Sequence, residues 1–451
     1  MTATLHTPPP LAAGTRALVL GLGRTGLAAA RYLDREGLTV RVADTRANPP
    51  GADALRDKVP AAELRTGAFD SSLLDDVAQV VISPGLSQQE PVVREALARG
   101  LPVVGDIELF ARAAQAPIAA ITGTNGKSTV TTLVAEIANA GGRRAVAGGN
   151  LGEPALDLLE RATPDLYVLE LSSFQLETTR SLRTVTATVL NVTPDHMDRY
   201  ASLEEYGAAK ARIFDGCDVA VINADDPAVR GMPRPGQSVL SFSLESREAD
   251  YTLECAPMPM IVRRGEPLLP LAAMRLQGLH NAANAMAALA MAEALALPLG
   301  PALEALCAFG GLPHRSQWVA DVRGVHYVND SKGTNVGATL AAVQGMAGPL
   351  VVIAGGDGKN QDFSGLREAF RGKVRHVVLI GRDAPTLAAT LADVCATERA
   401  TDMPAAVRAA HAVAQPGDTV LLSPACASLD MFRDYTHRGD EFAAAVRSLA
   451  A

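Results

Sequence analysis

The segment Gly123–Thr129 (GTNGKST) combines glycines, a lysine and hydroxyl side chains in an order typical of a loop that binds phosphate. It follows the aliphatic run Ile118–Ile121, which predicts a strand, and it precedes a helical pattern. Backbone N–H groups of such a loop can surround an anion, Lys127 can reach the β- and γ-phosphates, and Ser128 can bind Mg²⁺. The loop is shorter than a standard P-loop, because Ile121 stands where that pattern has its first glycine. We predict ATP binding here rather than a chance Gly-Lys-Ser in a turn.

A second glycine loop, Gly21–Gly26 (GLGRTG), follows the predicted strand Ala17–Leu20 and opens a helix. It lets the backbone approach a phosphate at a helix N-terminus, where negative charge is favoured. Asp44 ends the next predicted strand, about where dinucleotide-binding folds place an acid that contacts ribose. These features together favour a nucleotide site over glycines that only pack a helix on a sheet. They do not name the nucleotide, and a nicotinamide-dependent oxidoreductase is the main alternative.

Two residues with metal-binding side chains follow predicted strands. Glu170 comes directly after Leu166–Leu169, and His196 comes soon after Thr186–Leu190. Ligand contacts gather beyond the C-termini of parallel strands, and a carboxylate with an imidazole near phosphates suits a divalent cation. Each residue could equally make hydrogen bonds within its own loop. Lys210 lies in a predicted helix and, from its local sequence, is an ordinary surface lysine.

Aliphatic runs and helical patterns alternate along the chain, which predicts an α/β protein with doubly wound parallel sheets. A length of 451 residues suits three domains of roughly 150 residues each. Residues 231–275, rich in Pro, Gly and alternating apolar residues, predict β-hairpins or an inserted small sheet. We place the domains at residues 1–105, 106–311 and 312–451.

Composition argues against several classes of protein. The net charge is −8 and no basic stripe is present, so we expect no nucleic acid as a partner. The five cysteines are odd in number, far apart and without a C-x-x-C pair, which favours a reducing compartment over a zinc site or disulfides. Residues Met1–Pro10 lack the order of a secretion signal, and no apolar run is long enough to span a membrane. We expect a cytoplasmic protein without a membrane partner.

Over nearly its whole length the chain resembles the Mur ligases. Leu421–Asp430 (LLSPACASLD) is typical of the members that add D-glutamate, and the Asp-Asn-Pro-Arg motif typical of members that add diamino acids is absent. The segments that carry the resemblance are Gly21–Gly26, Thr122–Thr129, Gly148–Leu151, Leu169–Glu177, Asn191–Tyr200, Gly278–Asn284, Leu312–Arg315, Asn329–Asn335, Gly355–Lys359 and Leu421–Glu441.

The resemblance implies three domains: Rossmann-like at the N-terminus, P-loop ATPase-like in the centre and Rossmann-like at the C-terminus. It implies an enzyme that uses ATP and Mg²⁺ to join D-glutamate to UDP-N-acetylmuramoyl-L-alanine in peptidoglycan synthesis, and we expect a monomer. An acyl phosphate would form on the pathway, and ADP and phosphate would be released. The first glycine loop would then hold UDP rather than NAD. A non-catalytic nucleotide-binding scaffold is the remaining alternative.

The resemblance also implies roles for individual residues. For the UDP-sugar these are Thr25, Gly26, Asp44, Thr45, Arg46, Ser83 and Asn150. For ATP they are Thr124, Asn125, Gly126, Lys127, Ser128, Thr129, Val130, Asn281, Asn284, Arg315 and Asp330. The implied metal ligands are Ser128, Glu170, His196 and, if carbamylated, Lys210. D-glutamate would meet Thr334, Lys359, Ser428, Leu429 and Tyr435, the last being a position where the family often has Phe. The implied catalytic residues are Lys127, His196, Lys210 and Lys332.

Overall fold

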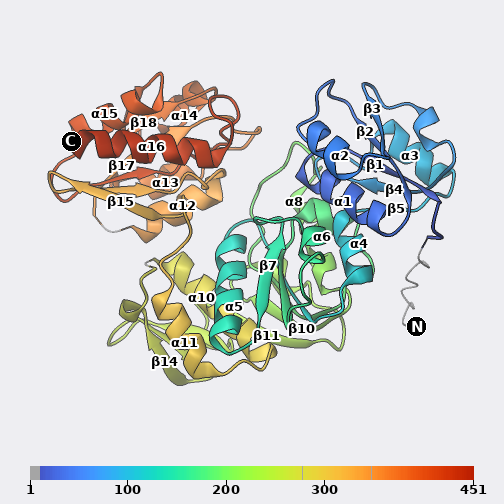
Figure 1. Ribbon diagram of the computed structural model, residues 1–451. Helices are drawn as coiled ribbons and strands as arrows, with labels where there is room; N and C mark the ends of the chain where they lie inside the picture. Colours follow the sequence, from blue (N-terminus) through green and yellow to red (C-terminus); the bar gives the residue numbers. More distant parts are fainter. Residues whose placement is uncertain (1–10, 277, 347, 451) are drawn as a thin grey trace.

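The computed structural model describes residues 11–276, 278–346 and 348–450, so the prediction about residues 1–10 lies outside them. The chain forms three lobes, each built around one sheet: an N-terminal lobe (blue in Figure 1), a middle lobe (cyan to yellow) and a C-terminal lobe (orange to red). The N- and C-terminal lobes both adjoin the middle lobe. The predicted three-part α/β architecture is therefore confirmed, while the boundary positions 105 and 312 stay a prediction.

The N-terminal lobe contains a five-stranded parallel sheet in the order β3-β2-β1-β4-β5. Alternate residues of the central strand β1 face opposite sides, so that Ala17 and Val19 enter one core while Leu18 and Leu20 enter another. This is the predicted doubly wound sheet. Its elements are β1 Arg16–Leu20, α1 Arg24–Arg35, β2 Thr39–Asp44, α2 Ala52–Lys58, β3 Glu63–Thr66, the 3-10 helix Ser71–Leu74, β4 Val77–Ile82, α3 Pro91–Ala98 and β5 Val103–Val104.

The middle lobe contains a nine-stranded sheet in the order β14-β13-β12-β11-β10-β9-β6-β8-β7. Its first part comprises α4 Asp106–Ala113, β6 Ile118–Thr122, α5 Lys127–Ala140, β7 Ala145–Gly149, α6 Ala155–Leu158, β8 Leu166–Glu170, α7 Ser173–Glu177, β9 Thr184–Val189, α8 Leu203–Ala211, the 3-10 helix Arg212–Phe214 and β10 Cys217–Asn223. The second part comprises α9 Pro227–Arg230, β11 Ser238–Ser243, β12 Tyr251–Glu254, β13 Met260–Arg263, β14 Glu266–Pro270, the 3-10 helix Leu271–Ala273, α10 Leu279–Ala294 and α11 Leu299–Ala308.

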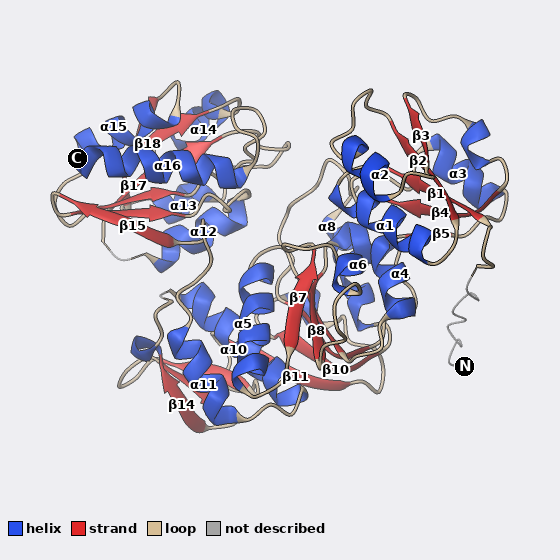
Figure 2. Ribbon diagram, in the orientation of Figure 1, coloured by secondary structure: helices blue, strands red, loops and turns tan. Residues whose placement is uncertain are grey.

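Residues 231–275 form the predicted hairpins, with β12, β13 and β14 antiparallel. They do not make a separate small sheet, however. Strand β11 pairs in parallel with β10, from Val219 opposite Ser238 onward, and β12 continues from β11. Strand β11 thus covers the edge that β10 would otherwise leave unpaired, and the lobe has one continuous sheet instead of two. Helices α5, α10 and α11 are in mutual contact in this lobe (Figure 2).

The C-terminal lobe contains a six-stranded sheet in the order β15-β16-β20-β17-β18-β19, in which only the β15–β16 pair is antiparallel. The predicted strands Leu350–Ala354, His376–Ile380 and Thr419–Leu422 are confirmed within a few residues. Its elements are β15 Gln317–Val322, β16 Val325–Asn329, α12 Val336–Gly345, β17 Leu350–Gly355, α13 Leu366–Phe370, β18 Val374–Ile380, α14 Ala384–Leu391, β19 Ala396–Arg399, α15 Met403–Val413, β20 Thr419–Leu422 and α16 Tyr435–Ala450.

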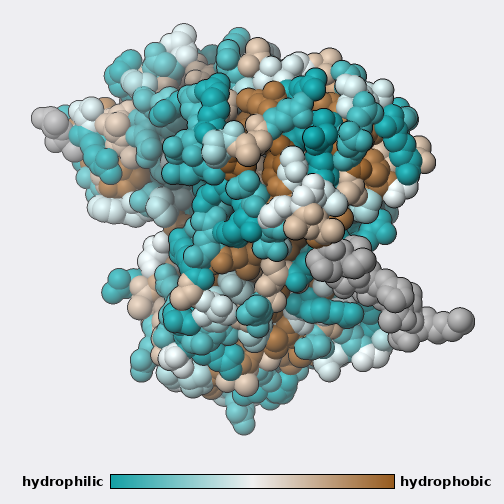
Figure 3. All heavy atoms as spheres, turned by 45° about the vertical axis from the view of Figure 1, so that its right-hand side comes forward, coloured by the Kyte–Doolittle hydropathy of each residue, from teal (hydrophilic) through white to brown (hydrophobic). Residues whose placement is uncertain are grey.

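Hydrophilic and hydrophobic residues are interspersed on the face of the molecule shown in Figure 3. Among the described residues, none of the helices has both the length and the apolar character that crossing a membrane requires.

Asp106 begins α4, the helix that leads from the N-terminal lobe into the middle lobe. Its side chain is buried; Oδ2 accepts a hydrogen bond of 3.0 Å from Gln175 Nε2, and Oδ1 has no partner among the described residues. Burial raises the pKa of Asp106 to about 6, even though the Gln175 hydrogen bond acts in the opposite direction. The junction between two lobes therefore contains a carboxyl group that resists ionisation.

We expect Asp106→Asn to stabilise the protein at neutral pH. The folded-state pKa of about 6 lies above the unfolded value of about 3.9, so stability falls as pH rises through that window. Removing the ionisable group should raise the free energy of unfolding by ~3 kcal/mol at pH 8, and the gain should shrink as pH falls toward 4. Thermal melts across this range measure it, with the exposed Asp75→Asn as control. A gain of equal size at every pH would instead indicate a packing effect.

Candidate active site

A cleft with a volume of about 690 Å³ lies between the middle and C-terminal lobes and reaches the N-terminal lobe at Pro84 and Gly85. We call it the central cleft. Although the whole chain has a net charge of −8, basic side chains outnumber acidic ones on the walls of the central cleft. This local excess favours a polyanionic ligand. The basic residues are Lys127, Lys210, Arg315, Lys332 and Lys359, and the acidic residues are Glu170, Asp195 and Asp330.

The predicted strand–loop–helix around the phosphate loop is confirmed, with β6 ending at Thr122 and α5 beginning at Lys127. Gly126 has φ +85°, and a Cβ there would lie 2.4 Å from Asn284 Oδ1, so this position requires glycine. Asn191 holds the loop in place: its Oδ1 accepts from the Asn125 N–H at 2.8 Å, and its Nδ2 donates to the Asn125 carbonyl at 3.1 Å. Both backbone groups of Asn125 are therefore fixed by one side chain.

Two lysine amino groups meet at one carbonyl of this loop. Lys127 Nζ donates to Gly123 O and Thr124 O, and Lys210 Nζ donates to the same Gly123 O, all at 2.9 Å. Burial lowers the pKa of both lysines, and the charge of Lys127 lowers that of Lys210 further. A bound anion would relieve this repulsion between neighbouring cations.

Lys210 is not the surface lysine that its local sequence predicted. It is 1% exposed, and its Nζ lies 4.3 Å from the centre of the Tyr206 ring. Helix α8 presents this side chain to the phosphate loop, which is more than 80 residues earlier in the chain. Only the packing of α8 decides that its lysine faces the interior.

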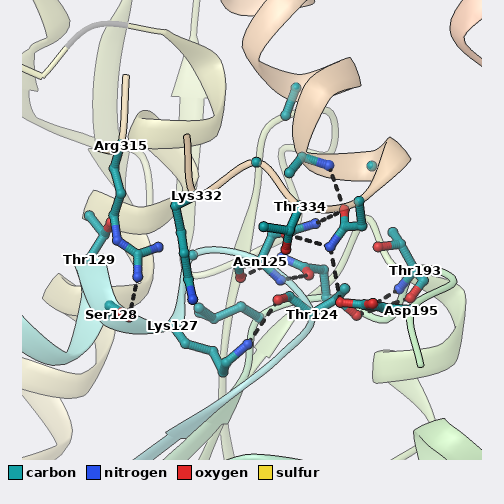
Figure 4. A pocket seen from close by; sticks show the side chains of 18 of the residues that line it. Thr124, Asn125, Lys127, Ser128, Thr129, Thr193, Asp195, Arg315, Lys332 and Thr334 are labelled. Atoms are coloured by element: carbon teal, nitrogen blue, oxygen red, sulfur yellow. Dashed lines mark hydrogen bonds between the residues drawn. The ribbon is translucent and has the colours of Figure 1, made fainter. Parts of the chain in front are cut away.

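Glu170 ends β8 and forms a chain of polar contacts with Ser128 and Arg315. Arg315 Nη2 donates to Ser128 Oγ (Figure 4). Ser128 Oγ in turn donates to Glu170 Oε2, and Asn150 Nδ2 donates to Glu170 Oε1 at 2.7 Å. Burial alone would raise the pKa of Glu170, but the charge of Lys127 and these hydrogen bonds outweigh it and lower the pKa. An ionised carboxylate thus lies beside a hydroxyl group, a pair of oxygen ligands that suits Mg²⁺.

No group of three or more His, Cys, Asp or Glu side chains suited to a metal occurs in the described part of the chain. A cation beside Glu170 and Ser128 would therefore need phosphate or water oxygens as well, which is usual for Mg²⁺.

His196 also lines the central cleft and has a left-handed backbone conformation, with φ +58°. Its N–H donates to Asp195 Oδ1 at 2.9 Å, and its ring meets the Phe174 ring edge-on at 4.9 Å. Burial lowers the pKa of His196, although the neighbouring Asp195 acts against this. The imidazole is therefore neutral near pH 7, as both metal binding and proton acceptance require.

The C-terminal lobe contributes the loop after β16. Lys332 Nζ extends toward Lys127 (Figure 4) and lies 4.0 Å from the centre of the Tyr435 ring; burial and then the charge of Arg315 lower its pKa to about 8. Burial raises the pKa of Asp330 to about 6, although Ser423 Oγ donates to it at 2.8 Å. This loop places a readily deprotonated lysine opposite the phosphate loop.

Polar contacts join the C-terminal lobe to the middle lobe across the central cleft. Lys359 Nζ forms a 3.0 Å salt bridge with Asp195, and Asn335 Nδ2 donates to the same carboxylate at 3.2 Å. Asn335 also exchanges side-chain hydrogen bonds with Asn125 in the phosphate loop. These contacts hold the C-terminal lobe, with its cations, next to the phosphate loop.

A second cleft lies at the loop Gly21–Gly26 of the N-terminal lobe, where Asn150 and Gln175 of the middle lobe also line it, and we call it the N-terminal cleft. Asp44 lines it, but both carboxylate oxygens are already used: the Leu22 N–H and the Arg46 guanidinium donate to them. The Arg46 hydrogen bonds lower the pKa of Asp44 to about 2. Asp44 therefore fixes the glycine loop and orients Arg46. Pro84, Gly85 and Asn150 line both clefts.

Three family models match consecutive stretches of the chain. Residues 15–105 match the Mur ligase MurD-like N-terminal domain, residues 121–292 the Mur ligase middle domain, and residues 314–426 the Mur ligase glutamate ligase domain. The chain belongs to the Mur ligase family. These three matches fall on the three lobes in order.

Relatives of this Mur ligase are similar over almost their full length. UDP-N-acetylmuramoylalanine–D-glutamate ligase of Nitrosococcus oceani is 52% identical over 436 residues, covering 96% of each chain. The enzyme of the same name from Methylococcus capsulatus is 51% identical over 97% of this chain and 95% of its own.

Solved structures support the fold of the Mur ligase. UDP-N-acetylmuramate–alanine ligase from Thermotoga maritima has a TM-score of 0.61 at 19% identity, over 96% of this chain and 99% of its own. The pseudomurein peptide ligase type C from Methanothermus fervidus has a TM-score of 0.56 at 18% identity, over 91% and 96%.

The Mur ligase brings most of the predicted site residues together. The central cleft is lined by Thr124, Asn125, Gly126, Lys127, Ser128, Thr129, Glu170, His196, Lys210, Asn281, Asn284, Arg315, Asp330, Lys332, Thr334 and Lys359. The N-terminal cleft is lined by Thr25, Asp44, Thr45, Arg46, Ser83 and Asn150.

The remaining predicted residues do not line either cleft. A Cβ at Gly26 would lie 1.8 Å from Gly21 O, so this glycine allows α1 to pack closely on the loop. Val130 is fully buried in the middle lobe, and Ser428 is buried while Leu429 is 73% exposed. Tyr435 contacts the site through Lys332.

Sequence reasoning missed Asn191, Asp195, Tyr206 and Asn335. Asp195 directly precedes His196, but its partners Asn335 and Lys359 are 140 and 164 residues away. Their polar character at strand and loop ends was a signal, but the pairing between them was not visible in the sequence.

Proposed function

We propose that this Mur ligase joins D-glutamate to UDP-N-acetylmuramoyl-L-alanine and converts ATP to ADP and phosphate in the same reaction. One observation carries the proposal: the N-terminal cleft continues, through Pro84, Gly85 and Asn150, into the central cleft, whose walls are mainly cationic. The first cleft suits the uridine nucleotide and the second suits ATP and the reacting carboxyl group. The relatives at about half identity carry the corresponding name.

The chemistry follows from the poor electrophilicity of a carboxylate. The alanyl carboxylate oxygen attacks the γ-phosphorus of ATP, the bond to the bridging oxygen breaks, and ADP leaves. The amine of D-glutamate attacks the carbonyl carbon of the resulting acyl phosphate, phosphate leaves, and the amine loses a proton. Both steps crowd anions, so Lys127, Arg315 and Lys332 act mainly by positioning and charge neutralisation.

The oxygen pair of Ser128 and Glu170 fits Mg²⁺, which when bound neutralises phosphate charge. Lys210 is buried with a strongly lowered pKa. A neutral amine is the form that takes up CO₂, so these surroundings favour the carbamylation that the family resemblance implies.

His196, whose ring is neutral, can bind a cation or accept the amine proton. Lys359 and Thr334 face the cleft where the two carboxylates of D-glutamate need cationic and hydrogen-bonding partners. The cytoplasmic location and the monomeric state stay predictions from the sequence.

A phosphate-release assay tests the substrate assignment. The purified enzyme is given ATP, Mg²⁺, UDP-N-acetylmuramoyl-L-alanine and one amino acid at a time. We expect release with D-glutamate and background with L-glutamate, D-aspartate, L-lysine and diaminopimelate, because the amine must reach the acyl carbon with both carboxylates held. If phosphate were released only with a diamino acid, that diamino acid and not D-glutamate would be the substrate. Fluorescence change with NADH and none with ATP would favour the oxidoreductase alternative.

A further inference from the structure

Arg199 lies outside the residues assigned to any substrate, yet it connects two lobes. Its Nη1 donates to the Pro84 carbonyl at 2.8 Å and its Nη2 donates to the Leu86 carbonyl at 2.9 Å. Both carbonyls belong to the N-terminal lobe, in the segment that follows β4, whereas Arg199 follows the His196 loop of the middle lobe. Its side chain is only 16% exposed.

The middle lobe holds this guanidinium group from two other directions. Glu177 Oε2 accepts from Nη2 at 3.2 Å, and the guanidinium carbon lies 4.0 Å from the centre of the Phe174 ring. Tyr200 donates its hydroxyl hydrogen bond to the other oxygen of Glu177. A planar guanidinium that stacks on a ring and donates to three acceptors has one permitted orientation, which a lysine could not reproduce.

The segment held by Arg199 is the wall between the two clefts. Ser83 to Leu86 line the N-terminal cleft, and Pro84 and Gly85 also line the central cleft. The other side of Arg199 reaches the central cleft as well, because the Phe174 ring beneath it contacts the ring of His196. A molecule that occupies both clefts must therefore pass over a segment whose position depends on Arg199.

We propose that Arg199 is a positioning residue for the substrate that spans both clefts. It fixes the wall at Ser83–Leu86 relative to the His196 loop, and thereby sets the separation between the nucleotide end and the reacting carboxyl group. The role rests on the proposed function in one respect: the spanning molecule is taken to be UDP-N-acetylmuramoyl-L-alanine. UDP alone, ATP and D-glutamate each occupy one cleft and do not depend on this separation.

Arg199→Ala tests the role by separating ligands that span the clefts from those that do not. We expect KM and the calorimetric Kd for UDP-N-acetylmuramoyl-L-alanine to rise roughly tenfold or more, since small displacements of a positioned group have effects of that order or larger. The Kd for UDP alone and the KM values for ATP and D-glutamate should stay within about twofold. The Kd of Arg199→Lys for UDP-N-acetylmuramoyl-L-alanine should lie between those of the wild type and Arg199→Ala. If the alanine variant does not fold, the lysine variant is used for the test instead.

Arg212→Ala is the matched control. Arg212 also donates to two backbone carbonyls, those of Leu176 and Thr179 at 2.8 and 2.9 Å, but all of these residues belong to the middle lobe. The Arg212→Ala variant should lower the melting temperature without a selective change in affinity for UDP-N-acetylmuramoyl-L-alanine.

Two outcomes would overturn the role of Arg199: an unchanged Kd for UDP-N-acetylmuramoyl-L-alanine, or an equal loss of affinity for UDP alone. Because binding is measured without turnover, the proposed function fails separately. Wild-type protein that binds the UDP-sugar but releases no phosphate would contradict the function and leave the result for Arg199 intact.

Discussion

We expect Lys127→Ala to lower kcat/KM for ATP-dependent phosphate release by roughly 1,000-fold. Lys127 Nζ now rests on the carbonyls of Gly123 and Thr124, and a nucleotide phosphate would offer it a stronger, charged acceptor. Its removal leaves the backbone N–H groups of the loop without a cation at the point where charge moves from the γ-phosphate to ADP. The effect should appear in kcat as well as in KM, because the contact strengthens in the transition state.

The control for this variant is Lys373→Ala. Lys373 also donates to a backbone carbonyl, that of Gln344, but it lies outside the central cleft. It should keep wild-type kinetics. The non-catalytic scaffold alternative makes the opposite prediction for Lys127→Ala, namely no loss of any function. Activity within tenfold of wild type would therefore contradict the role assigned to the phosphate loop.

The second large effect is expected from Glu170→Gln, with kcat lower by roughly 100-fold. Glutamine preserves the shape and can still accept from Ser128, so the loss should come from the missing charge. Glu170 raises the pKa of Lys127, and its removal makes that lysine easier to deprotonate. The high-pH limb of the kcat/KM profile should accordingly move to lower pH in the variant.

The Mg²⁺ dependence separates a metal ligand from a purely electrostatic role. If Glu170 binds the cation, the Mg²⁺ concentration for half-maximal rate should rise about tenfold in Glu170→Gln. Glu136→Gln is the matched control, because Glu136 is exposed on α5, the helix that follows the phosphate loop. An unaltered Mg²⁺ dependence in Glu170→Gln would show that Glu170 is not a metal ligand. Its role would then be limited to the electrostatic effect on Lys127.

The parts of this protein that sequence reasoning predicted well are those set by local conformation. The loop Gly123–Thr129 was recognisable because its glycines, lysine and hydroxyl groups must occur in that order between a strand and a helix. Glu170 and His196 were placed at one edge of the sheet because parallel strands bring their C-termini together. The continuous sheet through β11 and β12 was not predicted, since strand pairing depends on neighbours and not on the strand's own pattern.

Residue types and their spacing thus determined the three α/β units, the two glycine loops and the class of chemistry. Only the tertiary structure decided that Lys210 is buried against Gly123 and that the carboxylate of Asp44 accepts hydrogen bonds from Leu22 and Arg46. It also decided that Asp195 forms a salt bridge with Lys359 across the central cleft. The physical reason is that a backbone pattern depends on residues a few positions apart. Burial, pKa and ion pairing depend instead on groups brought together from distant parts of the chain, and a linear sequence does not state which groups these are.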